Sequence, residues 1–255
     1  MLFLYFTNIN TIWGVFLNHR RYIYISGLLY SACAVAFGVL AGYTVGAFTF
    51  DHIFKIVLSV IAAVCGFLGS YFRCLSYDDA EKSYRLMKNS ILILFLFYIM
   101  VLIDFTLIDD SLGRNIFNIY SWDKNTFSDY LENSVNLIPF FTVKLFWQGY
   151  LNGSLSFGDM AVNIVGNVIA FMPLAFFLPI FFKRINKWYS VLLTVALCVV
   201  FIELMQLAFL TGATDVDDVI LNTAGAMLMY GLLRIKKVEK FISNVTFGVF
   251  CGREK

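Results

Sequence analysis

The sequence predicts an all-α, polytopic membrane protein with about six transmembrane helices and both termini in the cytoplasm. Of its 255 residues, 60% are hydrophobic and only 14% are charged, and the mean hydropathy is +0.78, which excludes an ordinary soluble domain. A helix rises about 1.5 Å per residue, so a long uncharged helix can cross about 30 Å of hydrocarbon. The segments without any charged residue are 22–50, 56–72, 89–103, 160–182, 188–202 and 219–233.

The basic residues are distributed unequally between the two sides that alternating helices define. On one side, 15 of the 19 Lys and Arg residues lie in the connections 19–21, 73–88, 183–187 and 234–255. Because positive charge accumulates in cytoplasmic connections, this side is predicted to be cytoplasmic, and the acidic connections 109–159 and 211–218 are predicted to lie outside. The net charge of +2 gives no reason to expect a nucleic-acid partner, so the lipid bilayer is the first partner predicted.

The N-terminal segment is predicted to lie on the membrane rather than cross it. Residues 1–17 are apolar but short, and Phe3, Phe6 and Trp13 recur near helical spacing, which is typical of an interfacial helix. A short seventh span is the alternative. The predicted organisation is an interfacial segment at 1–21, a two-helix transmembrane pair at 22–72, a cytoplasmic linker at 73–90, a four-helix transmembrane domain at 91–234 and a basic tail at 235–255.

The candidate site consists of the polar side chains of the last four spans. Carboxylates and amides at membrane depth are costly, which makes each of them a functional hypothesis. Four-residue spacings place the polar residues of 159–167 on one helix face and those of 215–222 on another, and both faces reach the outer leaflet. The predicted outward-facing pocket contains Asn136, Asp159, Asn163, Asn167, Glu203, Gln206, Asp215, Asp217, Asp218 and Asn222.

Two structural alternatives compete with a functional pocket. The amides Asn163, Asn167, Gln206 and Asn222 could be hydrogen-bonding contacts between helices, each worth about 1 kcal/mol. The aspartates of 215–218 could cap the last span, because carboxylates satisfy free N–H groups at a helix N-terminus. One aspartate is enough for a cap, however, and three that face Glu203 favour a pocket.

Clustered carboxylates with amide oxygens suit a hard divalent cation such as Mg²⁺ or Ca²⁺. The predicted ligands are Glu203, Asp215, Asp217 and Asp218. The cation would hold the phosphate of a lipid or of a lipid-linked precursor, whereas carboxylates alone could bind a cationic group or relay protons. The sequence contains no nucleophile elbow, P-loop or HExxH motif, so whether the protein is an enzyme stays open.

Four ordered motifs carry a resemblance to a known family. They are Asn136-Leu-Ile-Pro-Phe140, residues 163–174, Glu203-Leu-Met-Gln206, and residues 215–222 with Gly225. Together they resemble the VanZ-like family of bacterial membrane proteins over about Ile91 to Leu233. Some members of that family carry an arginine just before the acidic cluster, where this chain has Ala213 and Thr214.

The family is named for a protein that raises resistance to teicoplanin-type lipoglycopeptides. The resemblance therefore implies a multi-pass protein of the bacterial plasma membrane that affects the susceptibility of the cell envelope to lipoglycopeptide antibiotics. Its candidate partners are a lipoglycopeptide or a lipid-linked cell-wall precursor. A metal-dependent enzyme acting on a lipid phosphate is the alternative, and a transporter or lipid flippase is the third hypothesis.

Overall fold

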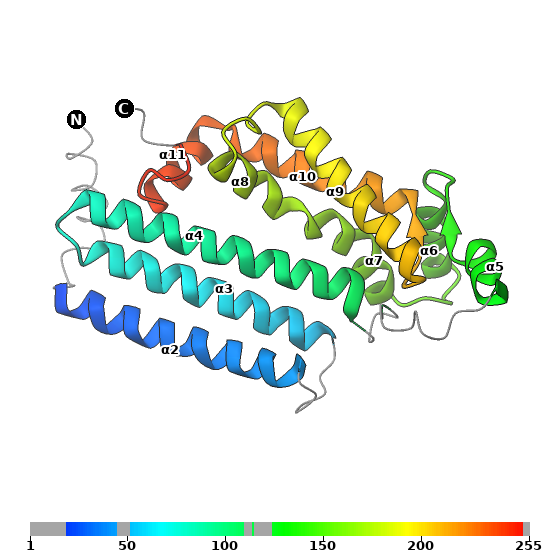
Figure 1. The fold of residues 1–255 in the computed structure, drawn as a ribbon, viewed down its shortest axis with the longest axis horizontal. Coiled ribbons are helices and arrows are strands. Elements are labelled where there is room, and N and C mark those ends of the chain that lie inside the picture. Colours follow the sequence, from blue (N-terminus) through cyan, green and yellow to red (C-terminus); the bar gives the residue numbers. More distant parts are fainter. Residues whose placement is uncertain (1–18, 45–51, 110–113, 115–123, 252–255) are drawn as a thin grey trace. The chain divides into compact units, whose positions relative to one another are not determined.

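The computed structural model describes residues 19–44, 52–109, 114 and 124–251. The interfacial helix predicted for 1–17 lies outside these residues. The chain divides into two compact units, one formed by Met1–Leu96 with Phe241–Lys255 and the other by Phe97–Lys240 (Figure 1).

The membrane-spanning helices match the predicted number. Among the described residues, six helical segments are long and apolar enough to cross a membrane, judged by length and composition. This confirms the all-α, polytopic fold class and makes the chain a multi-pass membrane protein. The segments are His19–Tyr43, Ile53–Leu75, Ala80–Ile108, Phe157–Phe181, Trp188–Phe209 and Val216–Leu233.

The first unit is built on a helix pair, α2 (His19–Thr44) and α3 (His52–Leu75), which lie side by side in Figure 1. Gly69 of α3 leaves room for the ring of Tyr30 of α2, since a Cβ on Gly69 would lie 3.0 Å from that ring. The hydroxyl of Tyr30 then lies 3.0 Å from that of Ser70. The helix α4 (Ala80–Ile103) follows, so most of the predicted linker 73–90 is helical.

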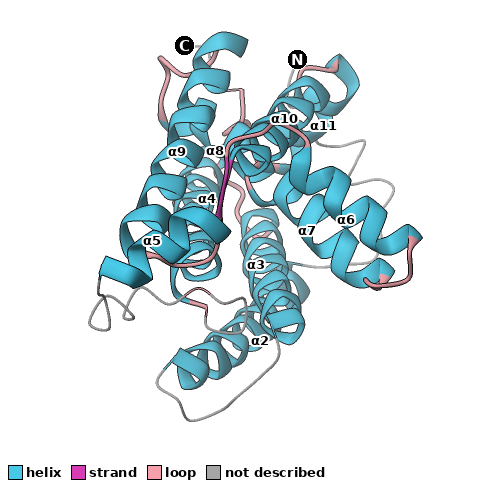
Figure 2. Cartoon of the chain, turned by 90° about the vertical axis from the view of Figure 1, so that its right-hand side faces the viewer, coloured by secondary structure: helices cyan, strands magenta, loops and turns pink. Residues whose placement is uncertain are grey.

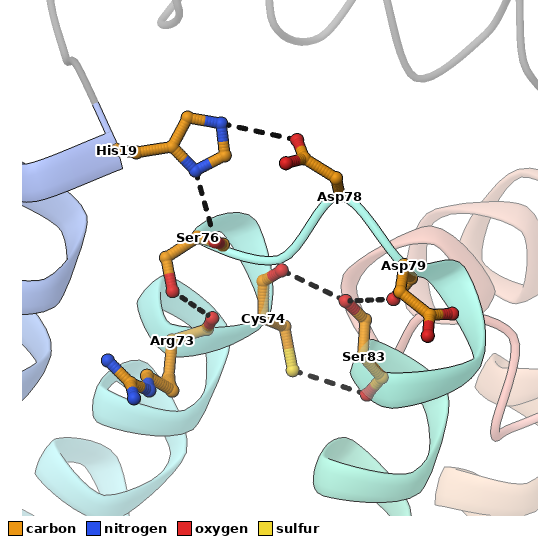
Figure 3. A network of polar contacts seen from close by, with 7 residues as sticks. All are labelled: His19, Arg73, Cys74, Ser76, Asp78, Asp79 and Ser83. Carbon is orange, nitrogen blue, oxygen red and sulfur yellow. Dashed lines mark hydrogen bonds and ion pairs between the residues drawn. The ribbon is translucent and has the colours of Figure 1, made fainter.

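A short polar turn joins α3 to α4 (Figure 3). Cys74 donates through Sγ to the carbonyl of Ser83, at 3.3 Å, and Ser83 donates through Oγ to the carbonyl of Cys74, at 3.0 Å. His19, at the start of α2, lies 3.0 Å from the carbonyl of Ser76 and 3.4 Å from the carboxylate of Asp78. These contacts connect all three helices at one end of the unit.

The second unit is centred on α10, which packs against α7, α8 and α9. In chain order the unit contains the last turns of α4, η1 (Asp104–Ile108, a π-helix), α5 (Lys124–Asn133), β1 (Val135–Asn136), α6 (Phe141–Leu151), α7 (Phe157–Ala170), α8 (Met172–Phe181), α9 (Trp188–Phe209), β2 (Thr214–Asp215) and α10 (Val216–Leu233). The helix α11 (Lys236–Val245) begins in this unit and ends in the first.

Two features of this unit differ from the sequence prediction. The predicted fourth span is two helices, α7 and α8, because Pro173 has no N–H to continue the helix. The carbonyl of Ala170 freed by this break accepts a hydrogen bond from the hydroxyl of Tyr98, at 2.8 Å. The predicted outer connection 109–159 also contains two helices, α5 and α6.

Candidate functional site

Two very short parallel strands bring the Asn136 motif to the acidic motif (Figure 2, magenta). Val135 pairs with Thr214, and Asn136 pairs with Asp215. The backbone N–H of Thr214 donates to the carbonyl of Ser134, at 2.9 Å. Beside this ladder the side-chain amide of Asn136 donates to the carboxylate of Asp215, at 2.9 Å. Two of the motifs that are far apart in the sequence therefore meet at one point.

Asp215 is the N-cap of α10 and the link to Glu203. Its carboxylate accepts the backbone N–H of Asp217, at 2.8 Å, as expected of a cap. Its own N–H donates to the carboxylate of Glu203, at 2.9 Å, and both side chains are buried. Glu203 thus faces the start of α10, where it accepts a hydrogen bond from the backbone of Asp215 and interacts electrostatically with Asp215 and Asp218.

Asp217 holds the start of another helix. The side chain is only 1% exposed, and it accepts the backbone N–H groups of Phe140, Thr142 and Val143, the last two at 2.9 and 3.1 Å. These N–H groups belong to the first turn of α6. The N-cap residue, Phe140, has a left-handed conformation with φ 64°, and its side chain forms no capping hydrogen bond. A carboxylate at a helix N-terminus satisfies free donors and interacts favourably with the helix dipole. Asp217 therefore caps α6 from α10.

Asp218 connects α7 to α10. The side-chain amide of Asn167 donates to the carboxylate of Asp218, and the amide of Asn222 donates to the carbonyl of Asp218, at 2.7 Å. Asn222 is buried, and its Oδ1 has no hydrogen-bond partner in the part of the chain that the structure describes. An unpaired buried acceptor of this kind is available to a ligand that carries an N–H or O–H donor.

Gln206 lies one turn from Glu203 and is almost fully buried. Its Nε2 donates to the carbonyl of Thr106 in η1, at 2.9 Å, while its Oε1 has no partner among the described residues. The hydroxyl of Thr211, just beyond the end of α9, is also buried without a partner there. This end of α9 thus has two buried polar atoms without a hydrogen-bond partner in the described part of the chain.

Arg114 is a functional candidate that sequence reasoning missed. Its aliphatic chain lies over Gly212, where an added Cβ would be 3.3 Å from Cγ of the arginine, and its Nη1 donates to the carbonyl of Phe105, at 2.9 Å. In this position its charge interacts with the carboxylates of Glu203 and Asp218. Arg114 therefore brings a guanidinium group close to the carboxylates of the acidic motif.

Tyr130 of α5 is a second residue that the sequence did not indicate. Its phenol lies 3.2 Å from the hydroxyl of Thr214 and is buried. Burial raises the pKa of Tyr130 above its ordinary value, so the phenol stays protonated at neutral pH and can donate a hydrogen bond. No local pattern connects Tyr130 or Arg114 to the acidic motif, because contacts made across the long connection leave no periodicity in the sequence.

The structure does not bring two of the predicted site residues into this cluster. Asp159 is exposed and forms a capping box with Ser156 at the start of α7, where the Ser156 hydroxyl donates to its carboxylate, at 2.7 Å. Asn163 is half-buried, and its side chain forms no hydrogen bond within the described residues. We therefore define the polar cluster as Arg114, Asn136, Asn167, Glu203, Gln206, Asp215, Asp217, Asp218 and Asn222.

The arrangement of the carboxylates bears on the predicted cation. Among the described residues, no group of three or more His, Cys, Asp and Glu side chains is arranged to hold a metal ion. Asp217 uses both carboxylate oxygens to accept backbone N–H groups, and Asp215 accepts two hydrogen bonds on one oxygen, whereas Glu203 and Asp218 each accept one hydrogen bond in the described part of the chain. Glu203 and Asp218 are close enough to interact electrostatically and are the remaining candidates for a cation.

Comparison with known proteins identifies relatives of this chain. The VanZ/LLP1 family model matches residues 95–237, which is more than half of the chain and includes the whole polar cluster. "Protein VanZ" from Enterococcus faecium is 28% identical over 171 residues, which cover 66% of this chain and 87% of that protein. No solved structure matches the chain. The helices α2 and α3 lie outside the family match.

Proposed function

The chain belongs to the VanZ/LLP1 family of bacterial membrane proteins, and from this premise we propose that it protects the cell envelope against teicoplanin-type lipoglycopeptides. The proposed site is the polar cluster, facing outward, where it would bind a lipoglycopeptide or a lipid-linked cell-wall precursor. Such molecules are amphiphilic, because each joins a lipid chain to a polar group rich in hydrogen-bonding atoms. The protein must therefore offer a polar and an apolar surface next to each other.

The contact between Asp217 and α6 carries this proposal. Asp217 fixes the first turn of α6 beside the cluster, and the residues around that turn are strongly exposed, with Leu137 at 73% and Phe140 at 61%. On the polar side, Gln206 and Asn222 offer unpaired acceptors next to a guanidinium group and two carboxylates. An amphiphile could place its lipid chain along the exposed apolar residues and its polar group against the cluster.

The functional test compares variants that change one charge at a time in a lipoglycopeptide-sensitive host. Glu203→Gln and Asp218→Asn keep the shape of the side chain but remove its charge, so we expect protection to fall to the level of the host without the protein. Asp159→Asn makes the same change at an exposed cap outside the cluster and should keep full protection. Susceptibility is the measurement, with membrane yield and monodispersity as checks on folding.

Two outcomes would count against the proposal. If both cluster variants protect as well as the wild type, the charges of the cluster have no role in protection. If the wild type itself gives no protection in a host where it reaches the membrane, the family assignment does not extend to this activity.

The divalent cation is the second part of the proposal and is restricted to Glu203 and Asp218. A ligand that binds only the folded state raises stability by RT ln(1 + [L]/Kd), or about 2.7 kcal/mol at one hundred times Kd. We therefore expect millimolar Mg²⁺ or Ca²⁺ to raise the thermal midpoint of the wild type in detergent. The double variant Glu203→Gln/Asp218→Asn should show no such rise. An unchanged midpoint in the wild type would mean that these carboxylates bind no such cation, and would exclude a metal-dependent enzyme at this site.

A further inference from the structure

A second candidate site lies in the first unit, at the turn between α3 and α4 and outside the family match. The structure has a shallow pocket of about 240 Å³ here, lined by Tyr77, Lys82, Arg85 and Leu86. The turn belongs to the side of the protein that the distribution of basic residues predicts to be cytoplasmic. Two cations, an aromatic ring and an aliphatic side chain therefore share one small surface at a membrane boundary.

The acidic residues of the turn are already engaged by other groups. Asp78 pairs with His19, at 3.4 Å, and Asp79 accepts the backbone N–H groups of Glu81 and Lys82, at 2.8 and 3.4 Å (Figure 3 shows both aspartates). The second set of bonds lowers the pKa of Asp79, which therefore stays ionised as the cap of α4. The carboxylate of Asp79 also interacts electrostatically with Lys82 and Arg85, but no salt bridge joins it to either of them in the described part of the chain.

The cations retain donors for a ligand. Arg85 uses Nε to pair with Glu81, at 3.3 Å, which leaves its two terminal nitrogens for another acceptor. Lys82 forms no salt bridge within the described residues, and its side chain is exposed. A phosphate group is the natural acceptor for an ammonium and a guanidinium that lie one helical turn apart.

The apolar part of the pocket distinguishes a lipid from a free phosphate ion. The guanidinium of Arg73 lies 5.4 Å from the ring centre of Tyr77, a cation–π contact that holds the ring in place. Leu86 supplies aliphatic surface next to the cations. An aromatic ring and basic side chains at the level of the headgroups are typical of sites for anionic lipids.

We propose that this pocket binds the phosphate headgroup of an anionic phospholipid of the predicted cytoplasmic leaflet. Lys82 and Arg85 bind the phosphate, and Tyr77 and Leu86 contact the glycerol and the first carbons of the acyl chains. The volume of about 240 Å³ accommodates a headgroup while the chains remain in the bilayer. The proposal is independent of the function proposed for the polar cluster.

The test uses the purified full-length chain in a neutral detergent. It is titrated with phosphatidylglycerol, with phosphatidylcholine of the same chains, and with inorganic phosphate, and bound ligand is counted by native mass spectrometry. We expect phosphatidylglycerol to bind in preference to both others. A basic residue near an anionic lipid contributes roughly 1 kcal/mol, so Lys82→Gln/Arg85→Gln should weaken binding about 30-fold.

The matched control is Lys236→Gln/Lys237→Gln, which removes two exposed positive charges from α11 and should bind as the wild type does. If the double pocket variant fails to fold, Lys82→Gln alone provides the test, because this side chain forms no salt bridge in the described part of the chain. Equal binding of phosphatidylcholine, equal binding of free phosphate, or undiminished binding to the pocket variant would each overturn the proposal.

Discussion

The variant Gly225→Ala should fail to form a stable second unit. A Cβ at Gly225 would lie 1.8 Å from the carbonyl oxygen of Val168 and 2.7 Å from its carbonyl carbon. Both are backbone atoms of α7, so no side-chain rotation can relieve the overlap, and α10 would have to separate from α7. Overpacking usually costs 1–3 kcal/mol, and we expect about 3 kcal/mol or more here because backbone must move. The thermal midpoint in detergent and the yield of monodisperse protein measure the effect.

Gly231→Ala is the control for this prediction. Gly231 lies on the same helix, but an added Cβ would meet nothing within 4 Å. Alanine is favoured over glycine in a helix by up to about 1 kcal/mol, so this variant should be as stable as the wild type or slightly more so. A Gly225→Ala protein with the wild-type midpoint would show that α7 and α10 do not touch at this position.

The second large effect is expected for Asp217→Ala. The substitution removes the acceptor for the three backbone N–H groups of Phe140, Thr142 and Val143. Leaving a buried donor unpaired costs about 1–3 kcal/mol, and water reaches some of these groups once α6 loosens, so we expect a loss of about 3 kcal/mol. Hydrogen–deuterium exchange should accelerate first at the start of α6, before the rest of the unit is affected.

The comparison with Asp159→Ala separates this effect from ordinary capping. Asp159 belongs to an exposed capping box at the start of α7, and loss of such a cap typically costs about 1 kcal/mol. Its variant should change exchange only at α7. If Asp217→Ala leaves the exchange of residues 140–143 unchanged, Asp217 does not anchor α6.

The sequence predicted the spans well because the bilayer imposes a length that hydropathy records locally. Helix breaks were harder to predict. Pro173 has no N–H to continue a helix, but an uncharged run from 160 to 182 has the hydropathy of one continuous span. The helices of the long connection were missed for a related reason. The segment that forms α6 is apolar but only 11 residues long, too short to be recognised as a span.

The sequence indicated many of the residues of the polar cluster, but it did not indicate which of them contact one another. Polar groups at membrane depth identified Glu203 and Gln206, which the structure places with the aspartates and amides of the cluster. Helical spacing also put Asp159 on the same face as Asn167, but a shared face does not fix depth, and Asp159 lies exposed at the helix start. The bond between Asp217 and Phe140 spans 77 residues, and no pattern in either segment records it.

The anchoring of α6 by Asp217 also has a thermodynamic consequence. If a cationic or hydrogen-bond-donating ligand reaches the carboxylate of Asp217, this one side chain of α10 takes part in two equilibria, the docking of α6 and the binding of the ligand. Coupling between two such equilibria is reciprocal. A ligand that binds Asp217 in place of α6 destabilises the docking of α6, and the docking of α6 lowers the binding free energy of that ligand by the same amount. A ligand that instead binds Asp218 or Gln206 leaves the anchor intact. The affinity of a ligand that binds Asp217 should therefore rise when the start of α6 is destabilised. The affinity of a ligand that binds Asp218 or Gln206 should not change.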